Sequence, residues 1–325
     1  MNLLEKYLRD LRDIRSTGSA VKEVSYYPAL VALLNEVGKT LKPKVRCVLT
    51  PKNQGAGIPD IGLFVVRQRF DETEAFLNLM PERGVLEVKG TQEAVAKIAQ
   101  SDQVKKYLER YGQVLVTNYR DFQLLSKDGA LEAYQLAPSE AAFWQADLNE
   151  TLTIHGERFI EYLKRVMLAN APLEAPQDVA WFLASYARDA RARIEAAGPV
   201  ALDSIRKALE EALGIQFTGE KGEHFFRSTL VQTLFYGVFS AWVLWHKETK
   251  SQQDKFDWRL AQHHLRVPIL RKLFHEVAEP GQLERLDLTE VLAWTAAALN
   301  RVNRVEFFSR FEAEHAVQYF YEPFL

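Results

Sequence analysis

Three polar side chains mark the ends of two apolar segments of the sequence. Asp60 opens the apolar run 61–66, and Glu87 and Lys89 stand at the end of the run 85–89. Both runs are expected to be strands, and strand side chains alternate faces, so Glu87 and Lys89 point the same way with Val88 opposite. If the two strands pair, Asp60, Glu87 and Lys89 converge on one spot. Two carboxylates beside a lysine suit Mg²⁺ and a phosphodiester.

We therefore predict a metal site in which Asp60 and Glu87 are ligands and the Val88 carbonyl is a third. Lys89 would orient and help deprotonate the attacking water, or stabilise the pentavalent charge. The alternative is structural: Asp60 caps a turn after Pro59, and Glu87 and Lys89 lie on a solvated strand face. That interpretation fits each residue alone. It does not predict polar residues on strands whose other positions are Leu, Val, Ile and Phe.

Two further polar residues follow on the next predicted helix, 91–111. Gln103 and Tyr107 are four residues apart and therefore share one face of the helix. The structural alternative packs Tyr107 against the sheet and leaves Gln103 at the rim.

The ordered set of Pro59-Asp60, Glu87-Val88-Lys89 and the Gln103–Tyr107 pair resembles the PD-(D/E)xK nuclease superfamily. The last pair resembles the extra motif of RecB-type nucleases and of nuclease domains in single-chain restriction-modification enzymes. Segments 22–30 and 115–122 look like parts of the N-terminal nuclease of type ISP and type IIG enzymes, so the resemblance covers residues 1–130.

The resemblance implies that Gln103 and Tyr107 support Lys89 or contact the DNA backbone. It also implies that Glu23, on an early helix, completes the metal site, although a surface charge beside Lys22 is the alternative. With a net charge of −2, the chain has no global basic field of the kind that histone-like proteins carry. A local basic rim would bind phosphates, although solvated charge is the default for each of its members: Lys44, Arg46, Lys52, Asn53, Lys105 and Lys106.

The order of elements predicts an α/β sandwich, with a mixed sheet flanked by helices, followed by an all-α domain. The resemblance implies that this sandwich is restriction-endonuclease-like. Two helices are expected before the sheet, one over 3–15 and a second that follows the break at 17–19 and ends near residue 41. Expected strands are 44–50, 60–66, 85–89, 114–117, 122–125 and 131–136. We expect a nuclease domain over 1–140, a helical linker over 141–176 and a helical connector over 177–325. Helices of the connector are expected at 177–197, 201–213, 223–247, 260–276, 288–299 and 307–319.

The connector holds the longest apolar run, 230–245, which is shorter than a membrane span and predicts a buried helix. Cys47 is the single cysteine, which excludes an internal disulfide framework and fits a reducing cytoplasm.

The aromatic ending 320–325 looks like the segment that precedes the methyltransferase of single-chain restriction-modification enzymes. No methyltransferase motif occurs in the chain, so we expect methyltransferase and target-recognition domains after Leu325. No helicase is visible, which favours the type IIG layout.

The residues and the resemblance together imply a Mg²⁺-dependent DNA endonuclease region, with Mn²⁺ as a substitute metal. The resemblance implies that it comes from a type IIG-like restriction-modification protein that serves phage defence. One such site cuts one strand at a time, so two copies would pair transiently on DNA. The alternative from another class is a catalytically silent DNA-binding or scaffold module that docks a methyltransferase.

Overall fold

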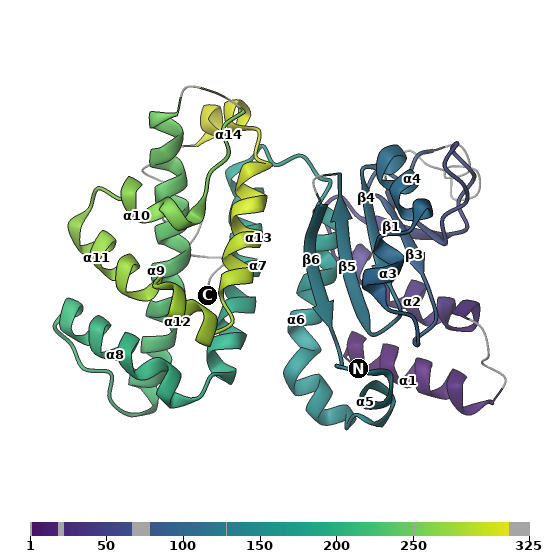
Figure 1. Cartoon of the computed structure of the whole chain (residues 1–325), viewed down its shortest axis with the longest axis horizontal. Helices are drawn as coiled ribbons and strands as arrows, with labels where there is room; N and C mark the ends of the chain where they lie inside the picture. The colour runs from purple at the N-terminus through teal and green to yellow at the C-terminus, as the bar shows by residue number, and fades with distance from the viewer. Residues whose placement is uncertain are drawn as a thin grey trace. The chain divides into compact units, whose positions relative to one another are not determined.

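The computed structural model describes residues 2–18, 23–66, 79–127, 129–249, 251 and 253–311. The chain divides into two compact units, Met1–Ala171 and Pro172–Leu325 (Figure 1). The first unit is built on a sheet and the second is helical. The predicted layout, a mixed sheet flanked by helices and then an all-α region, is confirmed.

In the described part of the first unit, the sheet has six strands whose order in space is their order in the sequence. They are β1 (Val45–Leu49), β2 (Ile61–Val65), β3 (Val85–Val88), β4 (Gln113–Thr117), β5 (Asp121–Ser126) and β6 (Gly129–Gln135). Strands β3 and β4 are parallel, and every other neighbouring pair is antiparallel. A parallel pair needs a crossover connection. Helices α3 (Val95–Ala99) and α4 (Asp102–Tyr111) supply it.

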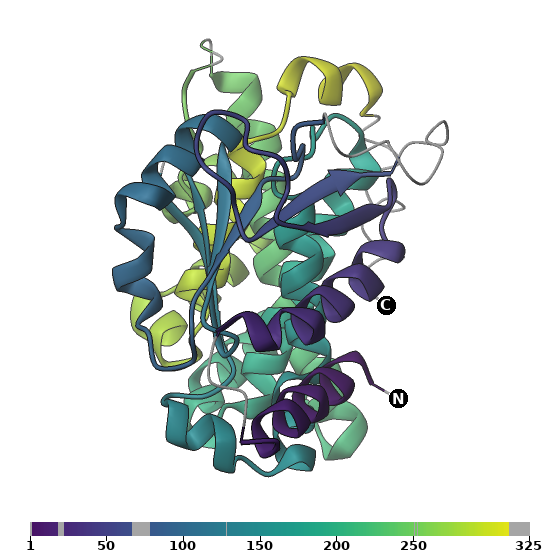
Figure 2. The same cartoon turned by 90° about the vertical axis from the view of Figure 1, so that its right-hand side faces the viewer.

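Helices cover both faces of the sheet. Leu86 and Val88 belong to a core with α1 (Leu3–Ser16), α2 (Tyr27–Lys39) and α6 (Leu148–Leu168). Val85 belongs to a second core with α3 and α4. Figure 2 shows the blue helices α3 and α4 on one side of the strands and the purple helices α1 and α2 on the other. Strand alternation therefore turns Glu87 toward the α3 and α4 face. The short elements η1 (Glu23–Tyr26) and α5 (Glu140–Gln145) complete the unit.

The helix predicted over 91–111 is two helices in the structure. Helix α3 ends at Ala99, and α4 begins after Ser101, whose hydroxyl accepts a hydrogen bond from the Val104 amide. A serine in this role satisfies one of the amides that a helix start leaves without an internal partner. The new start sets which face of α4 carries Gln103 and Tyr107.

The boundary between the units differs from the predicted domain boundaries. The structure places residues 141–171, most of the predicted 141–176 linker, in the first unit. The reason is the apolar face of α6, where Phe159, Tyr162 and Val166 are fully buried in the same core as α1 and α2. A helix with this much apolar surface cannot remain a solvated linker.

In its described part, the second unit consists of helices and one isolated parallel β-bridge, between Leu173 and Val302. Its elements are α7 (Pro176–Ala196), α8 (Pro199–Leu213), α9 (Gly219–Glu248), η2 (Trp258–Leu260), α10 (Ala261–His264), α11 (Pro268–Val277), α12 (Pro280–Arg285), α13 (Thr289–Asn300) and α14 (Arg304–Arg310). The apolar run 230–245 lies inside α9, where Trp242 is fully buried, as predicted. Within the described residues, no helix has the length and apolar content needed to cross a membrane.

Two helix predictions for the second unit differ from the structure. The helix expected over 260–276 is interrupted before Pro268, because the residue before a proline avoids helical backbone angles, and Val267 is extended. Helix α12 was not predicted. The helix expected over 307–319 begins earlier, at Arg304, and residues 312–319 of that prediction lie outside the described residues.

Candidate active site

Asp60 and Glu87 meet at the ends of the paired strands β2 and β3. Ile61 pairs with Leu86 and Gly62 with Val85, so extending the antiparallel register by one residue sets Asp60 opposite Glu87. The Asp60 carboxylate also accepts a hydrogen bond of 2.7 Å, through Oδ2, from the Val88 amide. The structural alternative had Asp60 cap the turn after Pro59, whereas the amide that it binds belongs to the strand that carries Glu87.

Lys89 joins Glu87 and Val88. Its Nζ lies 2.7 Å from Glu87 Oε1 and donates to the Val88 carbonyl over 3.1 Å. Glu87 is only 7% exposed, so it does not lie on a solvated strand face. A carboxylate this deeply buried needs a compensating charge or hydrogen bonds. The two carboxylates, the lysine and the Val88 carbonyl thus form one cluster, defined here as the Asp60–Glu87–Lys89 cluster.

Gln103 and Tyr107 reach this cluster from α4. The Gln103 side chain donates through Nε2 to the Ala56 carbonyl over 3.3 Å. Burial raises the pKa of Tyr107 to about 12; a hydrogen bond from Gln103 opposes this shift, and the neighbouring charges of Glu87 and Asp60 add to it. The Tyr107 phenol therefore lies within electrostatic range of both carboxylates and stays protonated through the neutral pH range. Tyr107 is buried against the sheet, as the structural alternative also required.

The loop before Asp60 is fixed against α4. Asn53 Oδ1 accepts hydrogen bonds from the amides of Gly55 and Gly57, over 2.7 and 3.2 Å. Gly57 has a φ of +104°, and a Cβ atom there would lie 2.7 Å from Gln103 Nε2. The backbone of the loop thus approaches Gln103 so closely that only glycine fits without a shift of the side chain.

The predicted basic rim lies on elements next to the cluster. Lys44 and Arg46 are exposed at the start of β1, which pairs with β2, and Lys52 and Asn53 are exposed in the loop that follows β1. Lys105 and Lys106 are exposed on α4, where Lys105 Nζ lies 3.2 Å from Asp102. Their binding of phosphates stays a prediction.

Glu23, the predicted further ligand, belongs to the 3₁₀ helix η1 and not to α2. Its side chain lies outside the described residues, as do all of Lys22 and the acidic segment 71–74. The neighbouring Tyr26 is described, and its ring packs edge-on against Tyr119 at 5.3 Å.

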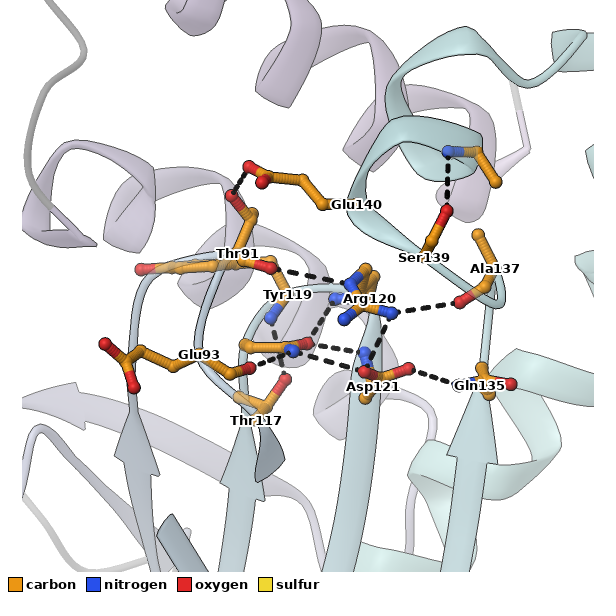
Figure 3. A network of polar contacts seen from close by, with 12 residues as sticks. Thr91, Glu93, Thr117, Tyr119, Arg120, Asp121, Gln135, Ala137, Ser139 and Glu140 are labelled. Carbon is orange, nitrogen blue, oxygen red and sulfur yellow. Dashed lines mark hydrogen bonds and ion pairs between the residues drawn. The ribbon is translucent and has the colours of Figure 1, made fainter. Parts of the chain in front are cut away.

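A hydrogen-bonded turn beside the cluster was not predicted as functional. The turn between β4 and β5 (residues 118–120, the β4–β5 turn) contacts the chain that follows Lys89 (Figure 3). Asn118 donates to the Glu93 carbonyl over 2.7 Å, and Arg120 donates to the Thr91 carbonyl over 3.5 Å. An asparagine and a charged residue between two short strands are the sequence signal for such a turn, but the sequence does not show which carbonyls they meet.

The donor set of the cluster suits a divalent cation. Two carboxylates and a backbone carbonyl are hard oxygen ligands of the kind that Mg²⁺ prefers. The Lys89 ammonium contacts both Glu87 Oε1 and the Val88 oxygen, so a positive charge already sits at two of the four predicted ligands. Among the described residues there is no group of three or more His, Cys, Asp or Glu placed to hold a metal, so a cation here would rely on the carbonyl.

Comparison with known proteins finds little. No protein family matches the chain, and no curated protein matches it. Among solved structures, the cryo-EM structure of a DrdV–DNA complex is similar over 99% of this chain, with 15% sequence identity and a TM-score of 0.33. The match covers 28% of the DrdV chain, so this chain spans less than a third of that protein's length.

Proposed function

We propose that the first unit is a Mg²⁺-dependent DNA endonuclease that hydrolyses phosphodiester bonds, and that the chain is part of a type IIG-like restriction-modification protein. One observation carries the proposal. Asp60, just before β2, and Glu87 and Lys89, at the end of β3, converge around the Val88 backbone. The resemblance to PD-(D/E)xK nucleases supports the choice of DNA as the substrate.

Each residue of the cluster has a role that its environment favours. Asp60, Glu87 and the Val88 carbonyl would hold the divalent cation, which when bound polarises the scissile phosphate and lowers the pKa of water. Lys89, once drawn from Glu87, would orient the attacking water or stabilise negative charge on the phosphate. Tyr107 keeps its proton, since its pKa is raised to about 12, and would serve as a neutral hydrogen-bond donor beside the carboxylates.

The test uses changes that keep side-chain shape and remove one charge. Asp60→Asn and Glu87→Gln should abolish plasmid nicking with Mg²⁺ or Mn²⁺, and they should weaken Ca²⁺ binding measured by calorimetry. The controls are Asp102→Asn and Glu109→Gln on α4, which remove the same charge from exposed positions. Those variants should nick as wild type does. Full cleavage by Asp60→Asn would refute the assignment.

A catalytically silent DNA-binding or scaffold module is the second candidate. The observation that favours it is the Glu87–Lys89 ion pair, because an ion pair at 2.7 Å already neutralises the buried carboxylate without a metal. Such a module would bind duplex DNA in gel shifts, would bind no Ca²⁺ at the cluster and would not nick plasmid. Calorimetry and nicking on the same preparation therefore separate the two candidates.

A further inference from the structure

A short segment joins the two halves of the candidate site. Residues 90–94 connect Glu87 and Lys89, on and just after β3, to α3 and α4, which carry Gln103 and Tyr107. At its start, the Lys89 amide donates to the Thr117 carbonyl over 2.9 Å, and the Glu93 amide closes a tight turn on Gly90 over 3.0 Å. The path of this segment therefore fixes how Lys89 lies relative to the α4 side chains.

Asn118 holds this segment from the β4–β5 turn. Its side chain is fully buried. The amide nitrogen Nδ2 donates to the Glu93 carbonyl over 2.7 Å and to Asp121 Oδ2 over 3.2 Å, and Oδ1 accepts from the amides of Asp121 and Arg120 over 2.8 and 3.2 Å. These four bonds use both donors and both lone pairs of the amide. The polar groups that surround it are thus matched to an asparagine.

The β4–β5 turn is itself held rigidly. Tyr119 is fully buried with a φ of +73°, a left-handed conformation that is rare for an aromatic residue. Its amide donates to Thr117 Oγ1 over 3.0 Å, and its carbonyl accepts from the Tyr7 hydroxyl over 2.8 Å. A strained conformation persists where the surrounding structure over-determines it, and such positions cluster at functional sites.

A second residue of the turn reaches the same segment. Arg120 donates to the carbonyls of Thr91 and Ala137 over 3.5 and 3.2 Å and lies 3.0 Å from the Asp121 carboxylate (Figure 3). The Thr91 hydroxyl donates to Glu140 over 2.6 Å, which ties the segment to α5 as well. The segment is therefore anchored from the turn at both Thr91 and Glu93.

From these contacts we infer that Asn118 is a positioning residue for the reaction. Its side-chain hydrogen bonds go to Glu93, Arg120 and Asp121 and not to the cluster, so it acts by fixing the Glu93 carbonyl and with it the chain between Lys89 and α3. The inference rests on the proposed function, because it concerns the placement of Lys89 in that site. A displacement of a reacting group by about 1 Å can cost a factor of about 100 in rate, so a loosened segment should be visible in the turnover number.

The decisive variant is Asn118→Asp. It keeps the shape and the acceptor oxygen but replaces the donor with a carboxylate that faces the Glu93 carbonyl and the Asp121 carboxylate. Asn118→Ala removes the contacts without adding charge, and it serves as the second variant if Asn118→Asp fails to fold. The matched control is Gln113→Glu at the other end of β4. Gln113 is 1% exposed, and its Nε2 donates to the carbonyls of Arg83 and Val166 over 3.1 and 2.9 Å.

Two measurements are made on the full chain. Plasmid cleavage with Mg²⁺ gives kcat and KM per folded molecule, and hydrogen exchange reports the amides of 89–93. For both Asn118 variants, kcat should fall by about tenfold to a hundredfold while KM for DNA stays within about twofold. The 89–93 amides should exchange about tenfold faster or more. Gln113→Glu should lower stability and leave kcat and the 89–93 amides unchanged.

Several results would overturn the positioning role. Normal kcat in an Asn118 variant whose 89–93 amides exchange faster would show that the segment does not set the rate. An equal loss of kcat in Gln113→Glu would reduce the effect to general destabilisation. If the wild type cleaves DNA and the Asn118 variants have the same kcat and the same exchange of the 89–93 amides, only this inference is refuted. A folded wild type that never nicks DNA with Mg²⁺ refutes the proposed function.

Discussion

Gly57 lies so close to Gln103 that an alanine at this position should displace the Gln103 side chain. Gly57→Ala would place a Cβ atom 2.7 Å from Gln103 Nε2, a separation at which something must shift. The Gln103 amide is the end of a flexible side chain, so it should be the group that moves. Its movement breaks the 3.3 Å hydrogen bond to the Ala56 carbonyl and takes Gln103 away from Tyr107.

A neighbouring glycine provides the matched control. Gly55 has nearly the same φ, +97°, but a Cβ atom there meets nothing within 4 Å. Both substitutions carry the backbone cost of a positive φ, about 1–3 kcal/mol. Gly57→Ala carries in addition the lost hydrogen bond of Gln103, about 0.5–1.5 kcal/mol. The two variants should therefore differ by about 1 kcal/mol in the free energy of unfolding, with Gly57→Ala the less stable.

Native-state hydrogen exchange of the amides of β2 and β3 measures this difference in the first unit alone. The same comparison in a Gln103→Ala background should show no difference, because the side chain that is displaced has been removed. Plasmid nicking by Gly57→Ala should fall below that of Gly55→Ala if Gln103 supports the cluster. Equal stabilities for the two alanine variants in the wild-type background would refute the reasoning.

Substitutions of Lys89, Tyr107 and Glu132 test three other features of the first unit. Lys89→Met removes the ammonium that lies 2.7 Å from Glu87 Oε1 and 3.1 Å from the Val88 oxygen, and with it a positive charge that repels a bound cation. Ca²⁺ affinity measured by calorimetry should therefore rise by about tenfold or more while nicking is lost. Unchanged or weaker affinity would contradict a cation site here. Because burial raises the pKa of Tyr107 from 10.0 to about 12, its contribution to stability is present below pH 10 and is lost as the pH rises through about 12. Tyr107→Phe should remove that alkaline loss in a pH series of urea titrations, and an identical series would count against it. Glu132→Ala removes the carboxylate that lies 3.0 Å from the fully buried Arg165. It should therefore lower the free energy of unfolding, measured by hydrogen exchange of the β6 amides, by about 3 kcal/mol. A loss below about 1 kcal/mol would show that the pair contributes no more than a surface ion pair does.

The strands that carry the cluster could be predicted from the sequence alone. Side chains in a strand alternate faces whatever the surrounding fold, so the positions of β2 and β3 and the shared side of Glu87 and Lys89 followed from spacing alone. The four-residue spacing of Gln103 and Tyr107 likewise fixed their common helix face. Local periodicity was less informative where it continued across a break, because it extended one helix through Ser101, where the structure begins a new one.

What these side chains contact could not be predicted from spacing, because it depends on how the elements pack. Glu87 is buried by elements other than its own strand. The hydrogen bonds from Gln103 to Ala56 and from Asn118 to Glu93 join residues that lie far apart along the chain. The apolar face of α6 packs in the core of the first unit, and this unit therefore extends to Ala171. Spacing determines which way a side chain points from its own strand or helix. Its partners depend on which elements pack together, and that is settled by the burial of the whole core.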